Sequence, residues 1–247
     1  MTAGGWTPWV ATTTIGPAVF PADLPSPGSL MTDVDMYTAA QPVESVRLRV
    51  RVRPASVLSS PWMMALSASD LAPAGPESGG VSSLRVPPRS QMDEAPEIRD
   101  RICSPTCVAM VLEFWGRRVS VAEVAAEVFH AGLDRYGVWP AAIHAAARRG
   151  VAGYLLRFPD WASASWCLTQ GLPVIASIRF ETGEIQGTPI PRTDGHLVVL
   201  TGEEDTHVLV NDPAAPSARD APRRYRHEEF CRVWLERGGV GYVLFPL

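Results

Sequence analysis

The stretch RICSPTCVAMVLEFWG, residues 101–116, holds two of the four cysteines of the chain at the front of an apolar run. Pro105 suits the first turn of a helix and Ser104 is a favourable N-cap, so the pattern predicts a helix that starts there and ends at Gly116. Cys103 would lie directly before this helix, where unpaired N–H groups and the positive end of the helix dipole favour an anion. A thiol at this position is expected to have a lowered pKa and is a candidate nucleophile.

Two other readings of the cysteine pair, a metal site and a disulfide, are weaker, and a third, core packing, is favoured for Cys107. A metal site lacks a second cysteine pair or an HxxxH motif nearby, and a disulfide across one helical turn is geometrically awkward. Cys107 shares a helix face with Val111 and Phe114, so core packing is the favoured role for it. Because a lone cysteine at a helix start is more often structural than catalytic, Cys103 needs a partner elsewhere in the chain.

A candidate partner lies in HLVVLTGEEDTHVLVND, residues 196–212, which has the pattern of a β-hairpin. With Glu204 at the centre of the turn, the opposing pairs are His196–Asp212, Val198–Val210 and Leu200–Val208. Asp212 can then hydrogen-bond to His196, fix its tautomer and stabilise an imidazolium ion. A register slip of one residue would bring Asn211 to the same place.

The residues around these motifs predict an α+β domain over residues 86–247. Ser120 and Glu123 form a capping box before one helix, Pro140 suits the first turn of the next, and Asp160 caps a third. Strands are expected over 151–158 and 172–180, the latter at the buried centre of a sheet, and a helix and a strand follow the hairpin. The helices come first along the chain and the antiparallel strands follow, and this order favours a fold in which the helices pack on a sheet.

Residues 1–85 are rich in Pro, Ser, Gly and Thr and predict a small β-rich region that ends in a linker. SVRLRVRVR, residues 45–53, alternates strictly between apolar residues and arginines, and strands at 31–38 and 61–69 are expected beside it. The row of arginines can be a binding surface, but a solvated face that discourages edge pairing is the favoured interpretation.

Composition excludes several classes of function. All 22 cationic residues of this 247-residue chain are arginines, so lysine-based catalysis is excluded. A net charge of −4 gives no reason to expect nucleic acid or an anionic membrane as a partner. No apolar run reaches the roughly 18 residues of a membrane helix, and the N-terminus lacks the pattern of a secretory signal, so a cytoplasmic protein is expected, or a secreted one if the N-terminus is processed.

The motifs CSPTCVAMVL, GHLVVLTG, VLVNDPA and YRHEEFCRVW together resemble the double-glycine (bacteriocin-leader) peptidase-like branch of the papain-fold cysteine peptidases. The resemblance covers residues 86–247 and implies a papain-like α+β fold without a metal or an organic cofactor. The chain differs from typical members of the family in two ways. No ABC transporter or membrane segment is visible, and Cys107 replaces a smaller Ser or Ala.

The resemblance also implies roles for four residues. Cys103 matches the nucleophile, His196 the base and Asp212 the acid that orients the histidine. Gln91 matches the glutamine that completes the oxyanion hole, although its 12-residue distance from Cys103 is longer than in transporter-fused members, and a plain surface loop residue is the alternative.

The predicted function is therefore hydrolysis of a peptide or amide bond through an acyl-enzyme on a Cys–His–Asp site. An acyltransferase or peptide-ligating enzyme would use the same intermediate, and fold alone does not choose between them. A non-catalytic peptide-binding module and a structural protein built on the β-rich region are the remaining alternatives.

Overall fold

The computed structural model describes residues 5–7, 9–10, 30–33, 36–49, 66–68 and 82–246. The chain divides into two compact units. The first holds Met1–Met64 with His130–Asp134, and the second holds Ala65–Phe129 with Arg135–Leu247.

In the first unit, β1 (Leu30–Asp33) and β2 (Met36–Ala39) form an antiparallel hairpin. The single strand predicted over 31–38 is therefore wrong. The two strands are separated by two residues, which is a common hairpin length, and an apolar–polar pattern this short does not reveal where a chain reverses.

The arginine-rich segment does not form the predicted strand over its described part. Residues 45–49 lie outside regular secondary structure, and Val46 and Leu48 are 60% and 48% exposed, so they do not form an apolar face against a core. The guanidinium of Arg47 lies 3.7 Å from the ring centre of Trp6, and that of Arg49 lies 4.0 Å from the ring centre of Trp9. Residues 50–53, and all of 61–69 except 66–68, are outside the described residues.

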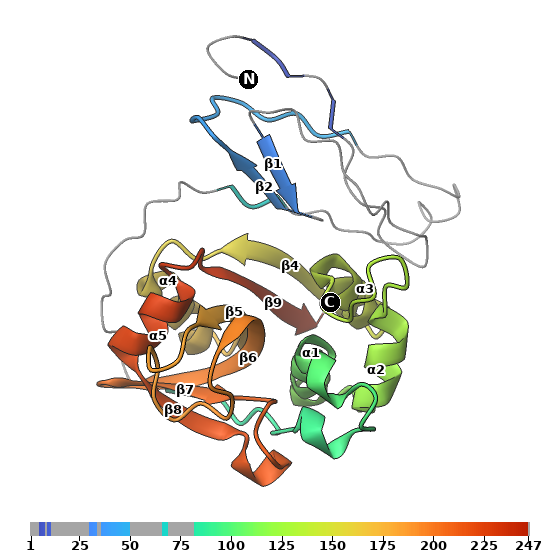
Figure 1. Ribbon diagram of the computed structural model, residues 1–247, viewed down its shortest axis with the longest axis vertical. Coiled ribbons are helices and arrows are strands. Elements are labelled where there is room, and N and C mark those ends of the chain that lie inside the picture. Colours follow the sequence, from blue (N-terminus) through green and yellow to red (C-terminus); the bar gives the residue numbers. More distant parts are fainter. Residues whose placement is uncertain are drawn as a thin grey trace. The chain divides into compact units, whose positions relative to one another are not determined.

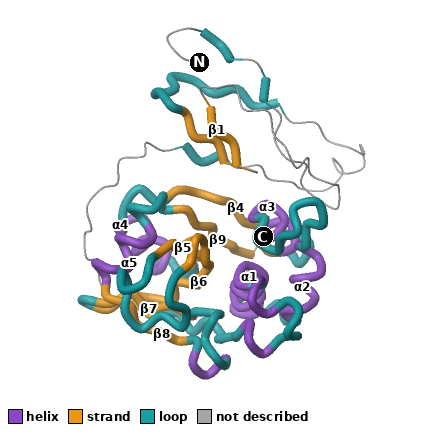
Figure 2. The backbone as a smooth tube through the Cα atoms, in the orientation of Figure 1, coloured by secondary structure: helices purple, strands orange, loops and turns teal. Residues whose placement is uncertain are grey.

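The second unit is an α+β domain, as the sequence predicts (Figures 1 and 2). Its helices are α1 (Cys103–Phe114), α2 (Val121–Val128), α3 (Trp139–Ala147), α4 (Trp161–Thr169) and α5 (His227–Trp234). Its strands are β3 (Ser82–Ser83), β4 (Val151–Arg157), β5 (Val174–Phe180), β6 (Thr193–Glu204), β7 (His207–Asn211), β8 (Pro222–Arg226) and β9 (Val240–Pro246). The strands make one antiparallel sheet in the order β4-β9-β5-β6-β7-β8, and β3 adds to β6.

Three of the sequence signals correspond closely to the helix and strand boundaries. The Ser120–Glu123 capping box is formed in both directions, and Asp160 accepts the backbone N–H of Ser163 at 2.8 Å. The run predicted as a buried strand forms β5 between β6 and β9, with most of its side chains buried. None of the helices in the described ranges combines the length and apolar character that a membrane span requires.

Helices cover both faces of the sheet and create two hydrophobic cores (Figure 1). α1, α2 and α3 pack on one face, where β6 contributes Leu197 and Val199. α4 and α5 pack on the other face, where β6 contributes Val198 and Leu200. Since side chains alternate along a strand, β6 supplies residues to both cores in turn.

A bulge in β6 between Leu200 and Gly202 reverses this alternation and directs Glu203 into the core under α4. Glu203 is 1% exposed, and its carboxylate accepts a hydrogen bond of 2.6 Å from the indole Nε1–H of Trp161 and another from the hydroxyl of Ser165. These bonds attach α4 to β6, because both donors lie on that helix.

The replacement of Glu203 tests this attachment. Glu203→Ala leaves two buried donors without an acceptor, so we expect the free energy of unfolding in a chemical denaturation experiment to fall by about 2–4 kcal/mol. Glu203→Gln is the matched control: its amide oxygen can accept from Trp161 and its amide nitrogen can donate to the hydroxyl oxygen of Ser165, so we expect a smaller loss. Equal losses in the two variants would show that the hydrogen bonds do not matter.

Candidate active site

Cys103 is the first residue of α1, with Ile102 in the N-cap position and no side chain capping the helix. The predicted cap at Ser104 is wrong: Ser104 is inside the helix, and its hydroxyl contacts the hydroxyl of Tyr242 at 3.3 Å. Cys103 is partly exposed, whereas the residues on either side of it are buried. The thiol is therefore in the first helical turn, where backbone N–H groups without an intrahelical acceptor favour a negative charge.

β6 and β7 pair two residues away from the predicted register. The turn lies after Glu204, which pairs with His207, and the pair beyond the bulge is Leu200–Val210 rather than Val198–Val210. In the part of the hairpin beyond the bulge, a shift of two residues keeps each side chain on its face, because side chains alternate with a period of two. His196 and Asp212 therefore remain on one face as diagonal neighbours, a spacing that a long side chain can bridge.

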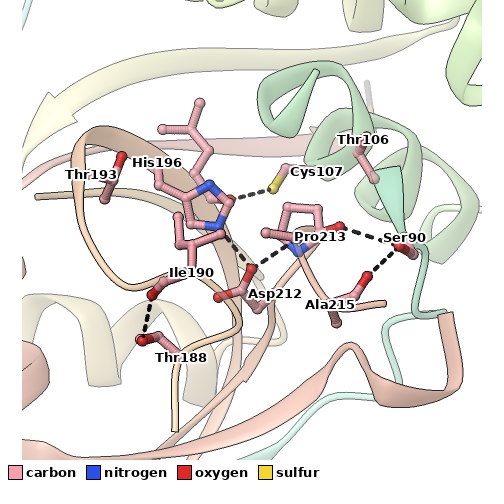
Figure 3. Close-up of polar contacts among 12 residues, drawn as sticks. Ser90, Thr106, Cys107, Thr188, Ile190, Thr193, His196, Asp212, Pro213 and Ala215 are labelled. Carbon is pink, nitrogen blue, oxygen red and sulfur yellow. Dashed lines mark hydrogen bonds and ion pairs between the residues drawn. The ribbon is translucent and has the colours of Figure 1, made fainter. Parts of the chain in front are cut away.

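The structure brings His196 and Asp212 into direct contact (Figure 3). The His196 Nε2 atom lies 2.7 Å from Oδ1 of Asp212, and the two side chains are 4% and 1% exposed. The same carboxylate oxygen accepts the backbone N–H of Ala214 at 2.9 Å, and the Asp212 backbone N–H donates to the carbonyl of Ala221 at 2.7 Å. The carboxylate is thus held in one orientation by groups on both sides of it.

His196 also forms a hydrogen bond with the thiol of Cys103. Because Nε2 faces Asp212, the ring nitrogen that remains for the thiol is Nδ1. The imidazole lies between a sulfur and a carboxylate, which is the arrangement that activates a thiol nucleophile. The structure therefore brings together three of the four residues that the sequence predicts.

In Cys103, His196 and Asp212, the effect of the neighbouring groups on the pKa is larger than the opposing effect of burial. Burial lowers the pKa of His196, but the charge and hydrogen bond of Asp212 and the contact with Cys103 raise that pKa to about 10. Burial raises the pKa of the Cys103 thiol, but His196 and the backbone N–H groups of Leu197 and Ser104 hold it below its ordinary value. Burial also raises the pKa of Asp212, and His196 outweighs this effect, so that the net shift is downward. Both shifts favour a thiolate and an imidazolium over a neutral thiol and a neutral imidazole.

Tyr225 is a member of this network that the sequence did not reveal. It is fully buried on β8, and its hydroxyl donates a hydrogen bond of 2.7 Å to Oδ2 of Asp212. Burial and the charge of Asp212 raise the pKa of Tyr225 well above its usual range, so the phenol stays protonated and remains a donor. A tyrosine flanked by arginines in PRRYR carries little strand signal, so neither β8 nor this contact could be predicted.

Gln91, the fourth predicted residue, is 6% exposed and lies next to the loop that follows Asp212. Its backbone N–H donates to the carbonyl of Pro213 at 2.8 Å, and the hydroxyl of Ser90 donates to the carbonyl of Ala215 (Figure 3). The Gln91 side-chain oxygen is buried and has no hydrogen-bond partner among the described residues.

Asn211, the alternative to Asp212, does not orient His196. Its side-chain amide donates to the carbonyl of Val86 at 2.9 Å, so it holds the segment that leads to Gln91. A buried Asn211 and a bonded Ser90 together fix residues 86–91 along the end of β7.

All four cysteines are free thiols, and three of them are buried. Among the described residues no group of three or more His, Cys, Asp and Glu side chains is arranged to hold a metal ion.

The Tyr225 contact leads to a test by denaturation. In Tyr225→Phe, Oδ2 of Asp212 stays buried without a donor, so we expect the free energy of unfolding at pH 7 to fall by about 1–3 kcal/mol. A lowered pKa in the folded state gives stability that is present above the unfolded pKa of about 4 and is lost as the pH falls through the folded value, so the loss should shrink at acid pH. Tyr242→Phe is the control because the hydroxyl of Tyr242 contacts the neutral hydroxyl of Ser104 instead of a carboxylate. Equal, pH-independent losses in both variants would contradict the charged contact.

A sequence profile of the Peptidase_C39 like family matches residues 83–242, and no curated protein sequence matches the chain. A putative C39-like peptidase from Bacillus anthracis is similar in structure, with a TM-score of 0.52 and 18% identity over 68% of this chain and 99% of the other.

Two further solved structures are similar with lower TM-scores. One is a double glycine motif protease from an AMS/PCAT transporter in complex with the leader peptide (21% identity, 67% of this chain, 95% of the other, TM-score 0.46). The other is the peptidase domain of Streptococcus ComA, a bi-functional ABC transporter involved in a quorum sensing pathway (17% identity, 65% of this chain, 99% of the other, TM-score 0.46).

The profile covers more than half of the chain, and the similarity to the Bacillus anthracis structure supports the papain-like α+β fold. The resemblance drawn from the sequence motifs is thereby confirmed. The chain belongs to the Peptidase_C39 like family and is a cysteine peptidase-like hydrolase.

Proposed function

We propose that this protein hydrolyses a peptide or amide bond through an acyl-enzyme on Cys103, with His196 as acid and base and Asp212 as the residue that orients the histidine. The single observation that carries the proposal is the position of His196, which is hydrogen-bonded to the Cys103 thiol on one side and to Asp212 on the other. The pKa of the Cys103 thiol is lowered, as a nucleophile needs, whereas burial raises the pKa of Cys107, Cys167 and Cys231.

The chemistry follows from the charges of the resting pair. The Cys103 thiolate attacks the carbonyl carbon and forms a tetrahedral oxyanion, and the His196 imidazolium gives its proton to the departing amine as the C–N bond breaks. The neutral imidazole then takes a proton from water, the resulting hydroxide attacks the thioester, and the thiolate leaves. Asp212 keeps the ring in position through both steps and stays ionised.

Gln91 supplies the second donor to the oxyanion in this proposal, beside the backbone N–H of Cys103. The first N–H groups of a helix have no intrahelical acceptor, so the Cys103 amide is available. The Gln91 carboxamide is buried beside the loop that follows Asp212, and its Nε2 group would be the donor to the oxyanion.

The catalytic domain is proposed to span residues 86–247, after a β-rich region at 1–85. The family profile begins at residue 83, and β3 at Ser82–Ser83 already pairs with β6, which supports a start close to the predicted boundary.

The reaction is tested with a pool of peptides from a whole-cell digest in water enriched in ¹⁸O. We expect the wild-type protein to release peptides whose new carboxyl group carries ¹⁸O, and Cys103→Ala to release none. Adding a primary amine separates hydrolysis from acyl transfer: peptides that leave mainly as amides would identify an acyltransferase. Cleavage that is equal in the wild type and in Cys103→Ala would contradict the proposal.

The role of Gln91 predicts a specific kinetic change. Removing one donor to an oxyanion costs roughly 10²–10³ in kcat, so we expect Gln91→Ala to lose about this factor with little change in KM on any peptide that the wild type cleaves. Gln170→Ala is the control, because Gln170 is exposed at the end of α4. A Gln91→Ala variant with wild-type kcat would remove Gln91 from the oxyanion hole.

A further inference from the structure

β6 has a free edge next to the active site. On one side it pairs with β5 throughout this region, with Leu197 opposite Ser177. On the other side its pairing with β7 begins only at Val199, opposite Asn211. The N–H and C=O groups of one residue in an antiparallel strand point to the same side, and this side alternates along the strand. Leu197 therefore points its backbone groups in the same direction as Val199, but β7 has already ended there.

The two cysteines of α1 bind these two backbone groups. The thiol of Cys107, labelled in Figure 3, donates to the carbonyl of Leu197 at 3.3 Å. The backbone N–H of Leu197 acts on the sulfur of Cys103 and lowers the pKa of that thiol. The two sulfurs are one helical turn apart, so α1 is aligned along the free edge of β6. The first turn of α1 thus occupies the position that a continued β7 would fill.

We propose that Cys107 is a positioning residue: its S–H bond to the Leu197 carbonyl fixes the first turn of α1 so that the Leu197 N–H and His196 both meet the Cys103 sulfur. This inference rests on the proposed role of Cys103 as nucleophile. It assigns a polar function to a residue that the sequence places simply in the core.

The chemistry of the buried thiol suits this role. Cys107 is fully buried, and burial together with the charges of Cys103 and Asp212 raises its pKa well above the ordinary value. It therefore keeps its proton while Cys103 is a thiolate, and it remains a donor over the whole working range of the site. Without this donor the Leu197 carbonyl would be a buried acceptor with no partner, which is costly.

Three substitutions separate the hydrogen bond from packing. Cys107→Ser keeps a donor, Cys107→Val keeps apolar volume without a donor, and Cys107→Ala removes both. The measured quantity is the rate of Cys103 alkylation by iodoacetamide as a function of pH. It is measured in the full chain and resolved by peptide mass spectrometry. Cys167→Ala is the matched control, because Cys167 is a buried cysteine in the other core.

We expect Cys107→Val and Cys107→Ala to shift the midpoint of Cys103 alkylation upward by about one pH unit, which lowers the rate at pH 6.5 by roughly ten-fold, since alkylation follows the thiolate fraction. Cys107→Ser and Cys167→Ala should keep the wild-type midpoint. A wild-type midpoint in Cys107→Val or in Cys107→Ala would overturn the inference and leave Cys107 as packing.

The same data distinguish this inference from the proposed function. A wild-type Cys103 that reacts no faster than an ordinary thiol would remove the nucleophile itself. Fast alkylation of Cys103 in the wild type and in all Cys107 variants would remove only the positioning role of Cys107.

Discussion

The early end of β7 is the constraint on which the rest of the site depends. Because β7 stops at Asn211, the edge of β6 at Leu197 is open, and the N-terminal turn of α1 docks there. Alternation along β6 directs Leu197 toward the core under α1 and places His196 on the face of the other core. Only at an open edge can a thiol from one side of the sheet reach an imidazole from the other side.

The ionisation of His196 and Asp212 depends on two opposing effects: burial disfavours their charged forms, and their hydrogen-bond partners favour them. An isolated imidazolium or carboxylate in this environment would lose its charge, because burial disfavours the charged form. Asp212 stays ionised since His196, Tyr225 and the Ala214 backbone N–H all act on its carboxylate. These groups come from three separate segments of the chain. The network therefore forms only when β6, β8 and the loop after β7 have come together.

The parts that could be predicted from the sequence are those fixed by local chemistry. Helix caps, the buried strand β5 and the His196–Asp212 contact depend on residue type and periodicity, and the contact survives a two-residue error in register because alternation restores the face. The contact of Tyr225 and the bulge in β6 depend on tertiary pairing, which no local pattern encodes. The N-cap of α1 is Ile102, two residues before the predicted Ser104, whose hydroxyl contacts Tyr242 instead of capping the helix.

The most direct test of the central claim is the rate of Cys103 alkylation by iodoacetamide as a function of pH, compared between the wild type and His196→Ala. The thiolate–imidazolium pair predicts that wild-type Cys103 reacts fast well below pH 8.5, where an ordinary thiol of pKa about 8.5 is protonated, and that His196→Ala loses this advantage. Identical profiles that follow an ordinary thiol in both proteins would contradict the account and leave Cys103 as a structural residue at a helix start.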